Sequence, residues 1–190
     1  MADGVRRTSA ATRSPTDDYD RLRRRVLRAM PSGIYVLGTT SGSRMNLMTM
    51  NWATQVATEP KLVGISVAND ALSHELLREG HVFALSMVDR QDRTIVRRFV
   101  KPVVDVVLDS TGRAGEMNGV GITIKTTGAP ILDRAPYWLD CELRHQSNLG
   151  SHTWFVGEVV LAGTRETGAR SPEADAALLR MEDTRMSYGG

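Results

Sequence analysis

Short apolar runs of strand length follow one another from residue 34 onward, and Gly, Pro, Asn and Ser separate them. The run "IYVLGTT" is followed by the turn signal "SGSR" and then by "MNLMTMNWATQVA", which predicts two strands paired as a β-hairpin. After "EPK", the run "LVGISVA" is apolar almost without a break, as is typical of a strand buried on both faces. With 17 Gly and 7 Pro among 190 residues, the chain favours one domain of many short strands over a helical bundle.

Three stretches have helical character instead. "YDRLRRRVLRAM" predicts a helix that Asp17 or Asp18 caps and that ends at Pro31 and Gly33. "ALSHELLREG" predicts a short helix that turns Leu72, Leu76 and Leu77 inward and that Gly80 stops, and "RQDRTIVRRFV" predicts another. The strand "HVFALSMV" lies between these two short helices, and further short strands are expected around "GITIKTT".

The strongest strand pair is "YWLDCELRHQSN" with "SHTWFVGEVVLAGT", joined by the turn "NLGS". In the first of these, Trp138, Asp140 and Glu142 alternate with Leu139 and Cys141, as expected of a sheet with two unlike faces. The whole order predicts an all-β barrel with helical additions. No G-x-G-x-x-G follows the first strand, so a Rossmann dinucleotide site lacks its main sequence support.

The formal charge of +2 is unevenly distributed. Residues 1–28 carry eight of the 24 basic groups and four of the 22 acidic ones, so the remainder has a slight acidic excess and is no basic nucleic-acid surface. A solvated helix face explains the Arg-rich segment better than phosphate contacts do. The composition predicts a disordered tail over 1–16, a domain over 17–170 and a helical or extended tail over 171–190.

Cysteine usage and hydropathy indicate a cellular compartment. Cys141 is the only cysteine, so no intrachain disulfide can form and the reducing cytoplasm is expected. No apolar stretch approaches the roughly 20 residues of a membrane span, and the N-terminal residues have no signal-peptide core. The four His have no metal-ligand spacing, so no metal site is expected. Cys141 lies within a predicted strand and is interpreted as a small core residue rather than a nucleophile.

Polar side chains gather where two predicted strands end. Near the end of the first strand lie Asn46, Thr49, Asn51 and Thr54, and after the second strand follow Asn69, Asp70 and Ser73. Asp70 is interpreted as the N-cap of the next helix, and the free N–H groups of that helix offer an alternative seat for phosphate. A planar, apolar, phosphorylated ligand would match both groups of residues.

Four segments, "MPSGIYVLGTT", "NLMTMNWATQVATEPKLVGISV", "SHELLREGHVFALSMV" and "LGSHTWFVGEVV", resemble the flavin reductase-like, FMN-binding split-barrel family over about residues 28–165. The resemblance implies a mainly β, homodimeric split β-barrel with short inserted helices. It also implies non-covalent FMN, less often FAD, and hydride transfer from NADH or NADPH to the flavin, which a partner monooxygenase can then use. By analogy, the flavin ring and ribityl chain would contact Asn46, Met48, Thr49, Asn51, Trp52, Ala53, Thr54, Ser66, Val67, Ala68 and Asn69, and the phosphate would contact Ser73 and His74.

The segment before the last long strand also matches the family, but with a departure. Gly150 and His152 agree with a Gly-Asp-His pattern in which the His faces the flavin or nicotinamide, whereas Ser151 replaces the Asp. The resemblance makes His152 the candidate catalytic residue, with a hydrogen-bonded strand-end His as the alternative; for Trp52 the alternative is barrel core. The usual Pro-Pro is Glu59-Pro60-Lys61 here, and Arg44 is either a phosphate ligand or a surface turn residue.

Two other functions remain open beside flavin reduction. One is an FMN electron-transfer module of the flavoredoxin type, which would pass electrons to a protein without NAD(P)H activity of its own. The other is a split barrel that has lost its flavin and serves as a structural or ligand-sensing domain. Bound flavin would distinguish the flavin-less barrel from the reductase and the electron-transfer module. Flavin-dependent oxidation of NADH or NADPH would distinguish the reductase from the electron-transfer module.

Overall fold

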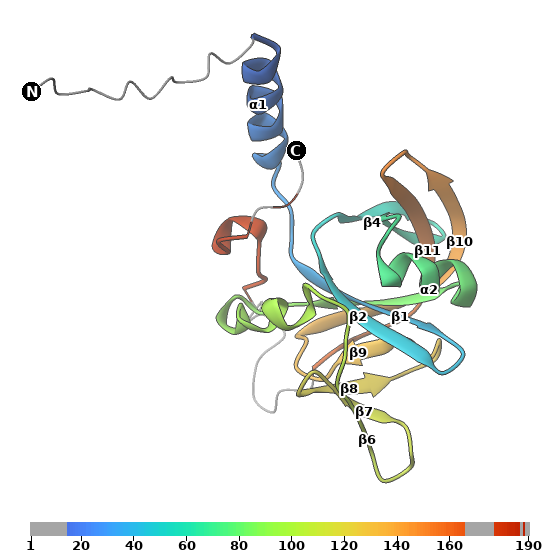
Figure 1. Ribbon diagram of the computed structural model, residues 1–190. Helices are drawn as coiled ribbons and strands as arrows, with labels where there is room; N and C mark the ends of the chain where they lie inside the picture. The colour runs from blue at the N-terminus through green and yellow to red at the C-terminus, as the bar shows by residue number, and fades with distance from the viewer. Residues whose placement is uncertain (1–14, 166–176, 187, 189–190) are drawn as a thin grey trace, which may run out of the picture. The chain divides into compact units, whose positions relative to one another are not determined.

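The computed structural model describes residues 15–165, 177–186 and 188, and these are mainly β strands (Figure 1). Seven antiparallel strands form the main sheet in the order β2-β1-β5-β10-β11-β4-β3. A second sheet has the order β6-β7-β8-β9. The main-sheet strands are β1 (Tyr35–Ser41), β2 (Arg44–Met50), β3 (Ala53–Thr58), β4 (Lys61–Ala68), β5 (Val82–Met87), β10 (Tyr137–Asn148) and β11 (His152–Thr164). Those of the second sheet are β6 (Val106–Leu108), β7 (Ala114–Met117), β8 (Val120–Ile124) and β9 (Pro130–Leu132).

The two outermost strands of the main sheet, β2 and β3, are consecutive in the chain. Only Asn51 and Trp52 separate them, and such a link spans roughly 10 Å. The sheet therefore curls until its two edges approach each other. The predicted hairpin of β1 with β2 is confirmed, but its continuation as one strand through residue 57 is wrong. The Trp52 carbonyl oxygen accepts a hydrogen bond from the Ser66 N–H at 3.0 Å, which transfers the chain to the ladder of β4.

The inner face of this curled sheet forms the main core. Five large side chains from four strands meet there and are almost fully buried: Leu37, Ile65, Phe83, Leu85 and Phe155. On β4, the core side chains are Val63, Ile65 and Val67, while Leu62 and Ser66 are only half-buried. The prediction that β4 is buried on both faces therefore holds for part of the strand only.

Helix α2 (Leu72–Gly80) packs on β1, β2 and β4, and Leu76 and Leu77 are fully buried as predicted, whereas Leu72 is half-buried. Gly80 is the last helical residue, and the left-handed residue that ends the helix is His81, with φ 56°. A Cβ atom on Gly80 would lie 1.8 Å from the Thr40 carbonyl oxygen. Gly80 is thus required for close packing against β1 rather than for the turn itself.

The second sheet covers the outer face of the main sheet over β1, β5 and β10. The Ser86 hydroxyl accepts a hydrogen bond from the Leu132 N–H at 3.0 Å, and a Cβ on Gly38 would lie 1.9 Å from the Pro130 carbonyl oxygen. Asp140 is fully buried beneath this sheet, where the Thr127 N–H donates to its carboxylate at 3.0 Å and the Thr127 hydroxyl donates as well. The alternation along β10 is as predicted, but the face that carries Asp140 is covered.

The predicted third helix is present as two 3₁₀ turns, η1 (Arg90–Asp92) and η2 (Ile95–Phe99). Part of the C-terminal segment also packs into this unit, which comprises residues 32–185. Leu179 is buried, accepts from the Ile34 N–H at 2.9 Å and donates to the Val88 carbonyl oxygen at 2.8 Å. A third 3₁₀ turn, η3 (Met181–Asp183), follows. The domain bounds proposed from the sequence stay a prediction.

Helix α1 (Pro15–Arg28) belongs to a separate unit. It begins at Pro15, so Asp17 and Asp18 lie in its first turn instead of capping it. Their negative charges there interact favourably with the helix dipole. Arg23 and Arg24 are exposed and both pair with Asp20, which agrees with a solvated helix face. Residues 1–14 of the predicted tail lie outside the described residues. In the described part of the chain, no helix combines the length and apolar character that a bilayer span requires.

Candidate functional site

Two aromatic rings meet on the outer face of β4 and β11. The ring centroids of Trp52 and His152 are 5.0 Å apart and their planes are inclined by 56°. His152 lies opposite Ala68, and Trp154 lies opposite Ser66, so these four side chains share one face of the sheet. The intervening Val67, Thr153 and Phe155 are buried on the other side. We call Trp52, Ser66, Ala68, His152 and Trp154 the aromatic face.

Gly64 fixes the position of Trp154 on this face. A Cβ atom on Gly64 would lie 2.0 Å from Cζ2 of the Trp154 indole, so the ring packs directly against the β4 backbone. Thr54 of β3 lies opposite Gly64 and is exposed. The aromatic face is therefore a surface of rings and small side chains, with hydroxyl groups at Thr54 and Ser66.

The turn that precedes His152 is held by Asn69. The Asn69 side chain donates to the Gly150 carbonyl oxygen at 2.6 Å, and its backbone N–H donates to the Ser151 carbonyl oxygen at 3.1 Å. Gly150 has φ +95°, which its lack of a side chain permits. The Ser151 hydroxyl lies 2.9 Å from His152 Nδ1. Ser151, which replaces the Asp of the family pattern, thus contacts the imidazole of His152.

A second histidine lies on the inner side of the sheet. His74 Nε2 is 2.9 Å from the Thr153 hydroxyl, which itself donates to Asn69 Oδ1 at 2.9 Å. Because the hydroxyl has one proton to donate, this geometry fits an imidazole that carries its proton on Nε2. Burial lowers the pKa of His74, and the positive charge of Arg78 lowers it further. His74 is therefore a neutral, structural link between α2 and β11.

Several of the predicted flavin contacts are engaged within the protein. The Asn46 side chain donates to the Ser73 hydroxyl and accepts from the Val103 N–H, each at 2.9 Å, and both Asn46 and Ser73 are buried. The Thr49 hydroxyl donates to the Val96 carbonyl oxygen at 2.5 Å, and the Asn51 amide donates to the Ser32 hydroxyl at 3.3 Å. Met48 and Ala53 pack against the main core, to which Val67 belongs.

The predicted set is therefore divided in two. The structure brings together Trp52, Ser66, Ala68 and His152, with Thr54 and Asn69 at the margins, and it places Asn46, Met48, Thr49, Asn51, Ala53, Val67, Ser73 and His74 in core contacts or internal hydrogen bonds. The sequence analysis missed Trp154, although its position two residues after His152 on a strand indicates a shared face. The roles of the predicted residues as flavin contacts stay predictions.

Two charged residues near α2 had alternative predicted roles, and one of these roles is wrong. The N-cap of α2 is Ala71, and no side chain caps the helix, so the prediction for Asp70 is wrong. Arg44 Nη1 lies 2.7 Å from Glu75 Oε1 and 3.5 Å from Glu79 Oε2, as a surface turn residue does. Cys141 is fully buried, and burial with the adjacent Asp140 charge raises its pKa to about 12, which confirms a core residue. Within the described ranges, no three side chains are grouped as metal ligands.

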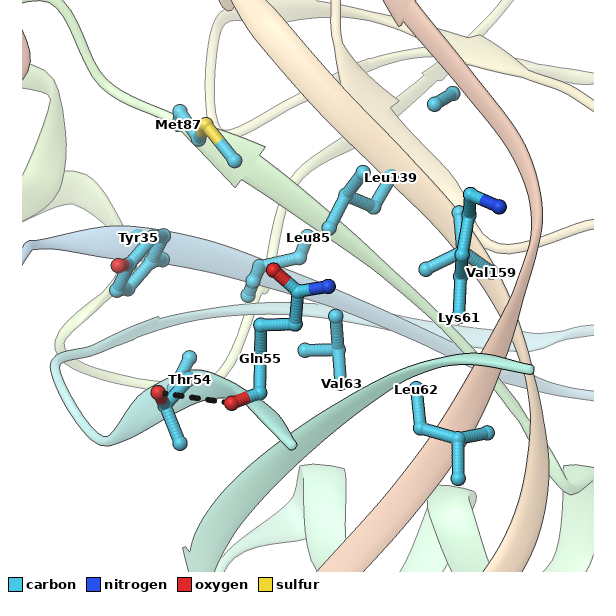
Figure 2. Close-up of a pocket in the computed structure, with 12 residues that line it drawn as sticks. Tyr35, Thr54, Gln55, Lys61, Leu62, Val63, Leu85, Met87, Leu139 and Val159 are labelled. Carbon is cyan, nitrogen blue, oxygen red and sulfur yellow. Dashed lines mark hydrogen bonds between the residues drawn. The ribbon is translucent and has the colours of Figure 1, made fainter. Parts of the chain in front are cut away.

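A pocket with a volume of about 340 Å³ opens on the inner face, where β1, β3, β4, β5, β10 and β11 converge (Figure 2). Leu85 and Val63 form its buried floor, and Gln55 and Lys61 lie at its exposed rim. We call it the inner-face pocket. Thr54, which lies opposite Gly64 at the margin of the aromatic face, also lines this pocket.

Comparison with known proteins identifies the domain. Residues 27–184 match the model of the flavin reductase like domain. The chain belongs to the flavin reductase-like family. An NADH-dependent FAD reductase of Streptomyces globisporus is 32% identical over 147 residues, which cover 77% of this chain and 78% of the relative. The predicted family membership is thus confirmed.

Solved flavin reductases have a similar fold. An NADH:FAD oxidoreductase of Streptomyces globisporus, solved with NAD and FAD fragments, superposes with a TM-score of 0.62 at 28% identity, over 87% of this chain and all of that one. The styrene monooxygenase flavin reductase of Pseudomonas putida superposes with a TM-score of 0.63 at 27% identity, over 76% of this chain and 87% of that one.

The residues of the aromatic face fit a flavin. An isoalloxazine is a large planar ring system with polar edges, and this face presents the rings of Trp52, His152 and Trp154 beside the small side chains of Ser66 and Ala68. Hydroxyls at Ser66 and Thr54 are available for its polar edge. Within the flavin reductase-like domain, this face therefore matches the ligand chemistry that the family name states.

Proposed function

We propose that the protein is an NAD(P)H:flavin oxidoreductase that reduces a non-covalently bound flavin. Its membership of the flavin reductase-like family, with relatives named as NADH-dependent flavin reductases, carries this proposal. A bound flavin accepts the hydride of a reduced nicotinamide at N5. The protein then has to bind two planar rings, hold them in contact and exclude water, which needs no acid–base pair.

We infer that the aromatic face is where the rings stack. Trp52 and Trp154 would provide apolar walls, and Ser66 and Thr54 would bond the polar edge of the flavin. His152 contacts Trp52 and is only half-buried, so its imidazole would be accessible to orient the nicotinamide. The buried hydrogen bonds of Asn46, Ser73 and His74 support the strands behind the face, so their part in flavin binding would be indirect.

The specific nucleotides are part of the proposal. FMN is the flavin that the sequence resemblance favours, whereas two relatives are named for FAD, so both belong in the assay. NADH is the expected donor because the relatives are named for it. A relative named as the flavin reductase of styrene monooxygenase supports delivery of reduced flavin to a monooxygenase. We further propose a homodimer in the cytoplasm, for which the single buried thiol is suited.

The decisive experiment measures oxidation of NADH and NADPH by the purified full-length protein with FMN, FAD or no added flavin. Oxidation that depends on flavin supports the reductase. Flavin binding without nicotinamide oxidation would assign the protein to electron transfer instead, and failure to bind either flavin would leave a structural barrel. Sedimentation at several concentrations tests the homodimer, and a strict monomer would contradict it.

A further inference from the structure

Helix α1 carries an apolar stripe that is exposed in the described part of the chain. Tyr19, Leu22 and Val26 are spaced three and four residues apart, so they lie on one face of the helix, and Ala29 continues the spacing. The side chains are open to solvent, Tyr19 to 66% and Val26 to 60%. Helix α1 has 14 residues, and isolated helices shorter than about 12–15 residues are marginally stable in water. The stripe is therefore expected to bind a partner that stabilises the helix.

The spacing of the stripe is that of a contact between two helices. Positions 19, 22, 26 and 29 are the a and d positions of two heptads, which form the seam of a helix pair. Helices that lie on a lipid surface are instead rich in Lys and Arg on the polar face and in Trp, Phe and Leu on the apolar one. In α1, Asp17, Asp18 and Asp20 would be repelled by an anionic membrane. The stripe therefore favours another helix as its partner.

Two charges beside the stripe have no partner within the described part of the chain. Asp18 and Arg25 are seven residues apart, at the g positions of the two heptads, so both lie along the same side of the stripe. Neither side chain forms an ion pair or a hydrogen bond with another described residue. Along the other side, Arg23 occupies the e position and pairs with Asp20 of the same helix. One side is thus neutralised, and the other has an unpaired charge of each sign.

A second copy of the helix pairs these two charges in one orientation. In an antiparallel pair related by a two-fold axis, the g positions of the two helices are adjacent, so Asp18 of each helix lies beside Arg25 of the other. A parallel pair would instead place Asp18 beside Arg23, which is already paired with Asp20. The distribution of charge therefore selects the antiparallel orientation.

The sizes of the apolar side chains favour the same orientation. Antiparallel helices place a positions opposite d positions, so Tyr19 lies against Ala29 of the other helix and Leu22 lies against Val26. The largest side chain of the seam then faces the smallest, which fills the space between the helices evenly. In a parallel pair each side chain would face its own copy, with two Tyr rings in one layer and two Ala methyl groups in another.

We propose that α1 pairs in an antiparallel orientation with α1 of a second copy of the chain, through the apolar stripe and two reciprocal ion pairs between Asp18 and Arg25. The pairing rests on the homodimer proposed above and deepens it by naming a contact between the two chains. It is independent of flavin and nicotinamide.

Charge-reversed variants of the full-length protein, Asp18→Arg and Arg25→Asp, test the ion pairs. Amide hydrogen exchange of peptides from residues 19–30, followed by mass spectrometry, measures the protection of α1. Each variant places like charges at both contacts, so exchange should be about tenfold faster than in the wild type. Arg21→Asp is the matched control, because it makes the same change of charge at a c position away from the stripe. If the control exchanges as fast as Arg25→Asp, the effect is local and the proposal is overturned.

A mixture of the two variants is the sharper test. In a mixed pair, one helix has two positive charges at the g positions and the other has two negative charges, so both contacts become attractive. An equimolar mixture of Asp18→Arg and Arg25→Asp, refolded together from urea, should regain wild-type exchange, whereas each variant refolded alone should not. Mixing leaves the intrinsic stability of each helix unchanged, so a recovery requires contact between different chains. Exchange in the mixture that equals the average of the separate variants overturns the proposal.

Other occupants of the stripe give different results. If α1 docks on its own chain, mixing the variants has no effect. If exchange slows only after phosphatidylserine vesicles are added, the stripe binds a lipid surface. Either result overturns the proposal.

Sedimentation and flavin-dependent NADH oxidation of the same samples keep the proposals distinct. A dimer whose α1 exchange ignores the charge reversals contradicts the helix pair and leaves the homodimer in place, whereas a strict monomer contradicts both. Absence of NADH oxidation, together with the expected exchange pattern, contradicts only the reductase.

Discussion

The side-chain amide of Asn69 donates to the carbonyl oxygen of Gly150 at 2.6 Å, joining the end of β4 to the turn that precedes His152. The same side chain accepts from the Thr153 hydroxyl at 2.9 Å. Asn69 therefore forms hydrogen bonds to residues on both sides of His152 in the chain. In the proposed reductase this makes Asn69 a positioning residue for the imidazole.

Asn69→Ala should lower both stability and activity. The loss of two hydrogen bonds at a partly exposed turn should cost about 1–2 kcal/mol in the free energy of unfolding, measured with urea. The freed turn should also raise KM for NADH more than it lowers kcat. Asp70→Ala is the control, since Asp70 is exposed and has no hydrogen bond or ion pair among the described residues. Equal kinetic effects of the two substitutions would exclude the positioning role.

Trp52→Ala should weaken flavin binding by up to about tenfold, because an aromatic stacking contact contributes about 0.5–1.5 kcal/mol. Trp52→Phe keeps a ring beside His152 and should retain most of the affinity. Fluorescence titration with FMN and with FAD measures the dissociation constants. Wild-type affinity in Trp52→Ala would place the flavin elsewhere than on the aromatic face.

Gly64→Ala should disturb the aromatic face through Trp154. The added methyl group would lie 2.0 Å from the indole, so the ring or the strand must shift, at a cost of about 1–3 kcal/mol. Trp154→Ala in the same chain should restore part of the lost stability. A double-mutant cycle by urea denaturation measures this coupling, and strictly additive effects would contradict the contact.

His74 should make stability depend on pH. Its folded-state pKa is lowered, so the unfolded chain binds a proton more readily, and stability falls as the pH decreases below the unfolded value of about 6.5. His74→Gln keeps a group that can bond the Thr153 hydroxyl but does not titrate. Urea denaturation between about pH 5 and 7.5 should show a flatter dependence for the variant. Identical slopes would show that His74 does not contribute.

Cys141 should be inert in the folded protein. Burial raises its pKa to about 12, so almost no thiolate forms at pH 8. A thiol reagent such as iodoacetamide should label the chain only after denaturation, as intact-mass measurement would show. Rapid labelling of the native protein would place Cys141 at the surface.

Local patterns predicted the elements whose structure depends on local sequence. The bounds of β10 and β11 follow from alternation and a Gly turn, and the prediction is confirmed over the whole of "YWLDCELRHQSN". The division of "MNLMTMNWATQVA" at Asn51 was not predictable in the same way. No Gly or Pro marks it, and the change of partner depends on strands from distant parts of the chain. The burial of Asp140 was not predictable from the local sequence either, because it depends on the second sheet.

The resemblance proposed the residues of the site, but it did not predict which way their side chains point. The motif around Trp52 contributes to the aromatic face, yet Asn46 of the same motif turns inward to Ser73 and Val103. Polarity alone does not tell whether an amide meets a ligand or a buried backbone group. Register across strands supplies that information, and it also adds Trp154 to the face.

The placement of β2 and β3 at opposite edges of one sheet has a consequence for biosynthesis. The hairpins β1–β2 and β3–β4 are local and leave the ribosome first, joined by two residues, whereas β5, β10 and β11 must later insert between them. Until then, β1 and β4 expose unpaired apolar edges, which are prone to aggregate. The nascent chain is therefore expected to depend on chaperones until β11 emerges, and only then does His152 reach Trp52.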